Sequence, residues 1–309
     1  MEYLILIVGL VLIIVGASLL TDGSVALAVR FRVPEFIVGL TVVAVGTSMP
    51  ELAVSFFSAL KGSGDMAIGN VVGSNICNTF LILGLCALLS PISFSRSNIR
   101  RDIPICIAAS AALLIATLSN GDINRIEGLV LFVAYVVMIV LTIRADRKAV
   151  KGEEEVDTEG VMPMWRTAVW IIAGLVALIY GGQLCVDAAT DIARSLGVSE
   201  ATIAITLVAV GTSLPELAAS LASIFKGRES LALGNVLGSN IANILLILGV
   251  CGTTTPLTMS GVAMSDICVA VATSLAIMLS ALFIGHHKLT RFEGALFLAV
   301  YVVYIYTLI

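Results

Sequence analysis

Long apolar runs, separated by short polar segments, follow one another along the whole chain. Most of the runs have about 18 to 25 residues, and a helix of about 20 apolar residues crosses the roughly 30 Å hydrocarbon core of a bilayer. The runs are continuously apolar, whereas the strands of a membrane barrel alternate between apolar and polar side chains. We therefore predict ten membrane-spanning helices, near residues 4–28, 36–60, 66–90, 103–119, 126–144, 167–190, 201–225, 231–256, 264–285 and 292–308.

The composition also indicates an all-α membrane protein. Of the 309 residues, 59% are hydrophobic and only 12% are charged, and the mean hydropathy is +1.09. A soluble chain of this size needs more polar surface, so a bilayer is the expected solvent. The chain starts with MEYLILIVGL, which has an acidic residue and no basic one, so we expect no cleavable signal peptide.

The basic residues are distributed unevenly between the two sides that the predicted spans define. One side carries Lys61, Arg125 and Arg194, and the other carries the remaining fourteen of the 17 basic residues. Basic loops face the cytoplasm, so we expect a multi-pass protein of the inner (plasma) membrane with both termini outside. The basic side holds Arg30, Arg32, Arg96, Arg100, Arg101, Arg144, Arg147, Lys148, Lys151, Arg166, Lys226, Arg228, Lys288 and Arg291.

One segment of the chain is duplicated. Residues 41–86 and 206–251 match at 29 of 46 positions, with a constant offset of 165 residues. Each half then holds five spans, and because five is odd the second half enters the membrane from the opposite side. This predicts two inverted-topology repeats, 1–144 and 167–309, joined by a cytoplasmic linker at 145–166. Such repeats place a substrate site near the bilayer midplane, where the halves meet.

Each copy combines helix-breaking residues with a carboxylate inside an apolar run. The sequences are GTSMPE at 46–51 and GTSLPE at 211–216, so Glu51 and Glu216 are equivalent. Proline removes a backbone donor and glycine loosens the helix, which predicts that the second and seventh helices are broken near residues 44–47 and 209–212. Carbonyl groups freed there need a partner, and an ionisable residue at this depth marks a pathway or a site.

The neighbouring oxygen atoms favour a hard cation. Ser48 lies three residues before Glu51, and the next span repeats polar residues every four positions. Carboxylate, amide, hydroxyl and carbonyl oxygens are ligands for Ca²⁺ or Na⁺, and one Ca²⁺ neutralises two glutamates. No nucleotide-binding motif occurs, so we expect transport coupled to an ion gradient, with no enzymatic activity and no cofactor. The repeated polar residues are Asn70, Ser74 and Asn78 in the first copy and Asn235, Ser239 and Asn243 in the second.

Together these blocks resemble the α-repeats of the sodium/calcium exchanger family, within the calcium/cation antiporter superfamily and of the prokaryotic ten-helix type. The resemblance implies that Glu51 and Glu216 coordinate Ca²⁺ with the backbone of Thr47 and Thr212. It also implies that the first and sixth spans slide across the other helices, so that the site opens alternately to the two sides of the membrane. The sodium ligands that it implies are Ala44, Thr47, Ser48 and Ser239 around Glu51, and Ala209, Thr212, Ser213 and Ser74 around Glu216.

The chain departs from many of these relatives at one pair of positions. Asn78 and Asn243 stand where many carry an aspartate, so the site has one titratable group fewer than in those relatives, and the identity of its monovalent ion stays open. The leading hypothesis is exchange of Ca²⁺ for Na⁺, and the alternatives are a Ca²⁺/H⁺ or K⁺-dependent exchanger and a passive cation channel. We expect a monomer in the lipid bilayer and no nucleic-acid partner.

Overall fold

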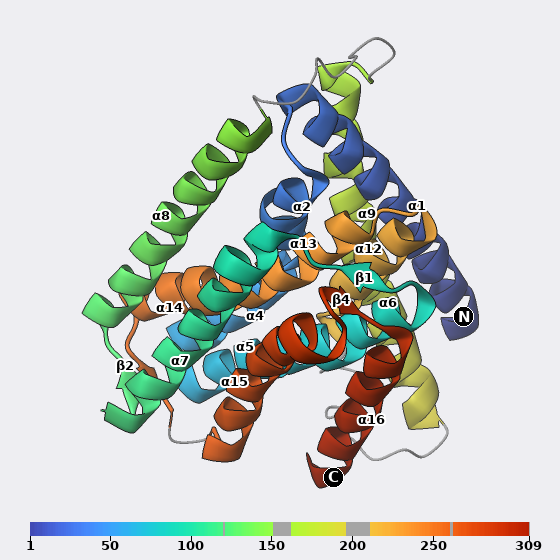
Figure 1. Cartoon of the computed structure of the whole chain (residues 1–309). Coiled ribbons are helices and arrows are strands. Elements are labelled where there is room, and N and C mark those ends of the chain that lie inside the picture. Colours follow the sequence, from blue (N-terminus) through green and yellow to red (C-terminus); the bar gives the residue numbers. More distant parts are fainter. Residues whose placement is uncertain (120, 151–161, 196–210, 260–261, 309) are drawn as a thin grey trace.

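The fold is known from a computed structural model, which describes residues 1–119, 121–150, 162–195, 211–259 and 262–308. Almost all of these residues are helical (Figure 1). The first half contains α1 (Glu2–Phe31), α2 (Glu35–Val38), the π-helix η1 (Gly39–Val43), α3 (Ala44–Thr47), α4 (Met49–Leu60), α5 (Gly64–Ile76), η2 (Cys77–Leu83), α6 (Gly84–Leu89), β1 (Ile92–Ser93), η3 (Asn98–Asp102), α7 (Ile103–Ser119), β2 (Asp122–Ile123) and α8 (Arg125–Val150).

The second half has a similar order in its described part, except that the π-helix η6 follows α15 whereas η3 precedes α7. It contains α9 (Met164–Ser195), α12 (Leu214–Phe225), α13 (Glu229–Ile241), the π-helix η5 (Ala242–Ile247), α14 (Leu248–Thr254), β3 (Leu257–Thr258), α15 (Met264–Leu279), η6 (Ser280–Ile284), β4 (Lys288–Leu289) and α16 (Arg291–Leu308).

Several of these helices are suited to a membrane. In the described residues, seven are long and apolar enough to cross one, or eight if the bent pair at 35–60 is counted as one span. The helix α12 has 12 residues, and the start of the predicted span at 201–225 lies outside the described residues. The protein is therefore a mostly helical membrane protein, as its apolar runs predict.

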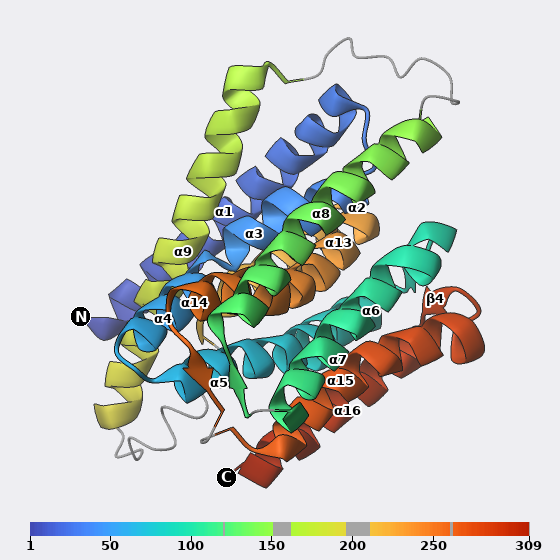
Figure 2. The ribbon, with the colours of Figure 1, turned by 90° about the vertical axis from the view of Figure 1, so that its left-hand side faces the viewer.

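Two of the spans form the centre of the molecule. In the most apolar 18-residue stretch of Gly64–Leu89, 78% of the residues are buried inside the molecule, and in that of Glu229–Thr254 the share is 94%. In the corresponding stretch of α1 only 33% of the residues are buried. Figure 2 shows the outer helices around them, with α7 and α15 on one side and α1 and α9 on the other. The central spans carry the repeated Asn and Ser residues, so these polar groups are shielded from lipid.

The long helices α1 and α9 pack along each other in antiparallel directions. Gly9 lies against Gly181, and Gly16 lies against Gly174. A Cβ atom built on Gly16 would lie 2.8 Å from the Gly174 carbonyl oxygen, so the two backbones touch directly. Gly9 and Gly174 are equivalent positions of the two halves, as are Gly16 and Gly181.

The short strands pair between the halves. β1 pairs with β4 so that Ile92 faces Leu289, and β2 pairs with β3 so that Ile123 faces Leu257. Since β1 corresponds in sequence to β3, and β2 to β4, the two small sheets are counterparts of each other.

The second predicted helix is broken near the expected residues. It bends by 48° between Glu35–Thr47 and Met49–Leu60. The stretch at 44–47 is the short helix α3, and the bend falls at Ser48, whose φ and ψ are −81° and 9°. The Ala44 carbonyl accepts the Ser48 N–H at 3.0 Å, so the break does not free this carbonyl.

Candidate cation-binding site

Glu51 and Glu216 lie in the interior, and each is only 1% exposed. A serine from the opposite copy holds each carboxylate. The Ser48 hydroxyl donates to Glu216 Oε1 at 2.8 Å, and the Ser213 hydroxyl donates to Glu51 Oε1 at 3.3 Å. The two carboxylates are thus brought to one place by reciprocal bonds between the halves.

The local sequence explains how these serines reach across. Ser48 and Ser213 are the N-cap residues of α4 and α12, with nearly the same backbone angles, and neither side chain caps its own helix. Pro50 and Pro215 stand in the first turn, where the missing N–H costs no helical bond. Each hydroxyl is therefore free to serve the other copy's glutamate, which lies in the first turn of its own helix.

Several buried oxygens at this place have no hydrogen-bond partner among the described residues. Buried polar atoms in proteins are nearly always paired with protein groups, water or an ion. The side chains are oxygen donors, the type that hard cations prefer. The atoms are Glu51 Oε2, Glu216 Oε2, Asn78 Oδ1, Asn243 Oδ1 and Ser239 Oγ, together with Asn240 Oδ1 beside Asn243.

The remaining predicted site residues are mostly buried near the same place. Thr47 donates its hydroxyl to the Val43 carbonyl at 3.0 Å and to Asn235 Oδ1 at 3.3 Å, and Ser74 is 4% exposed. Thr212 lies at the turn before α12, half-buried. The position of Ala209 lies outside the described residues.

Asn70 and Asn235 connect helices. Asn70 donates to the Glu51 carbonyl at 3.3 Å and to the Ser55 hydroxyl at 3.0 Å. Asn235 donates to the Glu216 carbonyl at 3.3 Å and to Ser220 at 2.9 Å. These equivalent bonds attach the central spans α5 and α13 to the helices that carry the two glutamates.

The polar residues that the sequence analysis missed lie beside Asn243. Asn75, Thr79 and Asn240 are at most 2% exposed and hydrogen bond with one another or with Asn243. Asn75 and Asn240 belong to the duplicated GSNI motif, which could have pointed to them. Asn75 lies off the helical face of Asn70, Ser74 and Asn78, and Asn240 lies off the equivalent face of its own span. The four-residue repeat of polar positions therefore does not include them.

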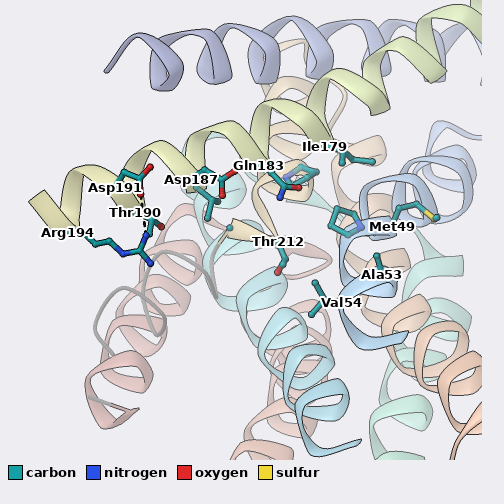
Figure 3. A pocket seen from close by; sticks show the side chains of 14 residues that line it. Met49, Ala53, Val54, Ile179, Gln183, Asp187, Thr190, Asp191, Arg194 and Thr212 are labelled. Atoms are coloured by element: carbon teal, nitrogen blue, oxygen red, sulfur yellow. Dashed lines mark hydrogen bonds and ion pairs between the residues drawn. The ribbon is translucent and has the colours of Figure 1, made fainter. Parts of the chain in front are cut away.

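A cavity of about 910 Å³ reaches the two helix breaks from one side (Figure 3). It lies between α9 and the starts of α4 and α12, and Met49 and Thr212 line it next to Ser48 and Ser213. Asp187, Asp191 and Arg194 of α9 also line it, and Arg194 pairs with Asp191 at 3.3 Å.

The chain matches the family described as sodium/calcium exchanger protein over residues 1–144 and 166–309, which is most of its length. The chain belongs to the sodium/calcium exchanger family. This membership identifies it as an ion transporter of the cation antiporter class, a family of transporters and not of enzymes.

Individual members of the sodium/calcium exchanger family resemble the chain over nearly its full length. The putative antiporter CaxA of Alkalimonas amylolytica is 38% identical over 97% of this chain and 96% of its own. The sodium/calcium exchanger MaX1 of Methanosarcina acetivorans is 31% identical over 99% of this chain and 98% of its own. The sodium-calcium exchanger NCX_Mj, solved after soaking in Na⁺ and Sr²⁺, matches with a TM-score of 0.86 at 33% identity, over 98% of this chain and 97% of its own.

Proposed function

We propose that this protein is a secondary antiporter that exchanges Ca²⁺ for Na⁺ by alternating access. The observation that carries the proposal is the pair of buried carboxylates, each hydrogen-bonded through one oxygen to a serine of the other copy. The second oxygen of each carboxylate has no partner among the described residues. Two carboxylates carry two negative charges, which one Ca²⁺ neutralises, and Na⁺ ions compete for the same oxygens.

The proposed ligands are the twelve residues that the sequence analysis identifies. Glu51 and Glu216 supply the charge, and neutral oxygens complete the shells of the ions. Because Ca²⁺ and Na⁺ share these ligands, both cannot occupy the site fully at once, which is a direct physical route to exchange. The neutral ligands are Ala44, Thr47, Ser48, Ser74, Asn78, Ala209, Thr212, Ser213, Ser239 and Asn243.

We further propose ten spans in two inverted repeats, 1–144 and 167–309, with 145–166 as the linker. Equivalent helices of inverted repeats run in opposite directions, and the antiparallel contact of α1 with α9 supports this arrangement. The reciprocal strand pairs support it as well, because β1 with β4 is the counterpart of β3 with β2. The arrangement places the broken helices and their carboxylates at the midplane, in a monomer.

Alternating access is supported by a difference between equivalent ends of the molecule. Lys226 donates to the Ser18 hydroxyl and to Asp22, both at 2.7 Å, and so joins the end of α12 to α1. Their counterparts in the other half are Lys61 and Asp187. Among the described residues no hydrogen bond or ion pair joins that second pair, and Asp187 lines the 910 Å³ cavity instead.

The loop charges indicate which end of the molecule faces the cytoplasm. Lys226 lies on the side with fourteen basic residues, which we propose is the cytoplasmic side of the inner membrane. On this proposal the 910 Å³ cavity opens to the outside, where both termini would lie, and the ion pair of Lys226 with Asp22 lies on the cytoplasmic side.

Transport in proteoliposomes tests the function. Uptake of radioactive Ca²⁺ is measured with Na⁺ inside and none outside, so that Na⁺ efflux drives Ca²⁺ entry. Glu51→Gln and Glu216→Gln each remove one charge of the site and are expected to abolish the Na⁺-driven uptake. Glu127→Gln is the control, because Glu127 accepts the Asn124 N–H at the start of α8 and lies outside the proposed site.

The other results of this assay have clear meanings. Uptake that follows an imposed pH difference or K⁺ gradient without Na⁺ would assign a different coupling ion. Ca²⁺ flux without any countertransported ion would indicate a channel. Full uptake by Glu51→Gln and Glu216→Gln would show that the proposed site is wrong.

A further inference from the structure

Asn243 is a buried side chain whose amide can turn two ways. One orientation presents the oxygen to a cation, and the other presents the NH₂ group, which repels it. Asn243 is 1% exposed and follows Ser239 by four residues on the central span α13–η5. The same span presents Asn235 to the Thr47 hydroxyl and to the Glu216 backbone carbonyl, so this face packs against the segments that carry Thr47 and Glu216.

A backbone carbonyl determines the orientation of the neighbouring amide. Asn75 donates its Nδ2 to the backbone carbonyl oxygen of Asn240 at 3.1 Å. A carbonyl oxygen can only accept, so the side chain of Asn75 must place its NH₂ on that side. Its Oδ1 therefore points the other way and can only accept a hydrogen bond.

The orientation is passed on to Asn243. The Nδ2 of Asn243 donates to Asn75 Oδ1 at 2.9 Å. With its NH₂ bound there, Asn243 directs its Oδ1 away from Asn75, and this buried oxygen has no partner among the described residues. An unpaired buried oxygen is what a cation ligand looks like before the ion binds.

The arrangement is present in one copy only. The counterpart of Asn75 is Asn240, but Asn240 donates its Nδ2 to the Thr79 hydroxyl at 2.8 Å. The position that corresponds to Thr79 is Ile244, which offers no hydroxyl to Asn75. In the described part of the chain no hydrogen bond joins Asn240 to Asn78, so Asn78 lacks this support.

We propose that Asn75 is a positioning residue for ion exchange: it holds Asn243 so that the amide presents its oxygen to the transported cation. This inference rests on the proposed function, since it concerns the same ions. It assigns the two asparagines of the site different tasks, with Asn243 held as a neutral oxygen ligand.

A double-mutant cycle tests the proposal. The variants are Asn75→Leu, Asn243→Leu and the double variant, and Asn75→Ser is run in parallel as a smaller change. The purified proteins are titrated with Ca²⁺ and with Na⁺, and the ion-dependent rise of the melting temperature gives the affinity. Thr79→Val is the matched control, because it removes a hydroxyl of the same cluster and leaves the bond between Asn75 and Asn243 intact.

We expect Asn75→Leu and Asn75→Ser to weaken binding of at least one ion about tenfold, as the loss of one oriented ligand would. In the Asn243→Leu background the same changes should alter affinity by less than about twofold. In the Asn75→Leu background, Asn243→Asp should recover affinity, because a carboxylate presents an oxygen in either orientation. Thr79→Val should bind both ions as the unmodified protein does.

Two results would overturn the role of Asn75. One is an equal loss of affinity from Asn75→Leu with and without Asn243, which would indicate a structural effect. The other is unchanged affinity in both Asn75 variants. An unmodified chain that binds neither ion and shows no Na⁺-driven flux would instead overturn the proposed function, and this inference with it.

Discussion

The central feature of the site is that each glutamate is held by a serine of the other copy. A hydroxyl that donates to a carboxylate stabilises its charge, and such a bond to a charged group contributes about 1.5–3 kcal/mol. Ser48 is 2.8 Å from Glu216 Oε1, whereas Ser213 is 3.3 Å from Glu51 Oε1. The two halves are therefore unequal even at these equivalent residues.

Removal of the shorter bond should affect ion binding more. Ser48→Ala is expected to weaken Ca²⁺ binding about tenfold, which corresponds to roughly 1.4 kcal/mol, and Ser213→Ala by a smaller factor. The measurement is the Ca²⁺-dependent shift of the melting temperature. Ser24→Ala is the control, since the Ser24 hydroxyl is buried without a partner among the described residues. Equal effects of all three substitutions would contradict the assignment.

Among the helices, the contact between α1 and α9 has an unusual construction. Glycine carbonyls and backbone atoms face each other there, and small side chains such as Ala177 and Cys185 pack beside the glycines. Such a contact lets two helices approach closely without interlocking side chains. This construction is compatible with a sliding pair, which the resemblance to exchangers implies for the first and sixth spans.

Two adjacent glycines of α9 provide a test of this contact. A Cβ atom on Gly181 would lie 2.8 Å from the Gly9 carbonyl oxygen, whereas on Gly182 it would lie 3.8 Å from its nearest neighbour, the Leu214 Cβ. Gly181→Ala should therefore lower the free energy of unfolding by about 1–3 kcal/mol relative to Gly182→Ala. Thermal unfolding in detergent measures the difference. Similar melting temperatures for the two variants would show that α1 and α9 are less closely packed.

Taken as a whole, the molecule is symmetric in sequence and asymmetric in structure. The hydroxyls of Thr21 and Ser223 lie 3.4 Å apart on the Lys226 side, and α1 packs against α12. On the other side the cavity separates Ile179 of α9 from Ala53 of α4. Exchange of these two arrangements between the halves would open the Lys226 side and close the side of the cavity.

The lysines at the two ends should then have different effects. Lys226→Ala removes the bonds to Ser18 and Asp22 and is expected to open the Lys226 side. A half-exposed ion pair contributes up to about 1 kcal/mol, so the open population should rise about two- to fivefold. A cysteine at Thr21 in a cysteine-free background reports this as faster labelling by a membrane-impermeant thiol reagent. Lys61→Ala is the control.

Lys61→Ala should leave the labelling rate unchanged or lower it. The reason is that no bond joins Lys61 to Asp187 among the described residues, although this pair is equivalent to Lys226 with Asp22. Equal labelling rates in the Lys226→Ala and Lys61→Ala variants would contradict the assigned closed side. The comparison is matched, because the two lysines are equivalent in sequence. Each is the C-cap residue of its helix, and Lys61 follows Glu51 by the same number of residues as Lys226 follows Glu216.

Much of this protein could be predicted from the order of its residues. Continuous apolar runs require helices in a bilayer, since backbone groups must be satisfied within each segment. The duplication identifies Glu51, Glu216 and their neighbouring oxygens, because carboxylates in apolar runs are rare and costly. These conclusions depend on local composition and on repetition, which are visible without knowing which helices touch.

Other features depend on how distant segments pack. The pairing of Ser48 with Glu216 joins residues 168 positions apart, and the bond of Asn75 to Asn243 does so as well. Two nearly identical copies also predict equal environments, whereas Lys226 is bonded to Asp22 and Lys61 is not bonded to Asp187 among the described residues. Only the folded molecule can show this difference, because in a single conformation the equivalent residues of the two copies make different contacts.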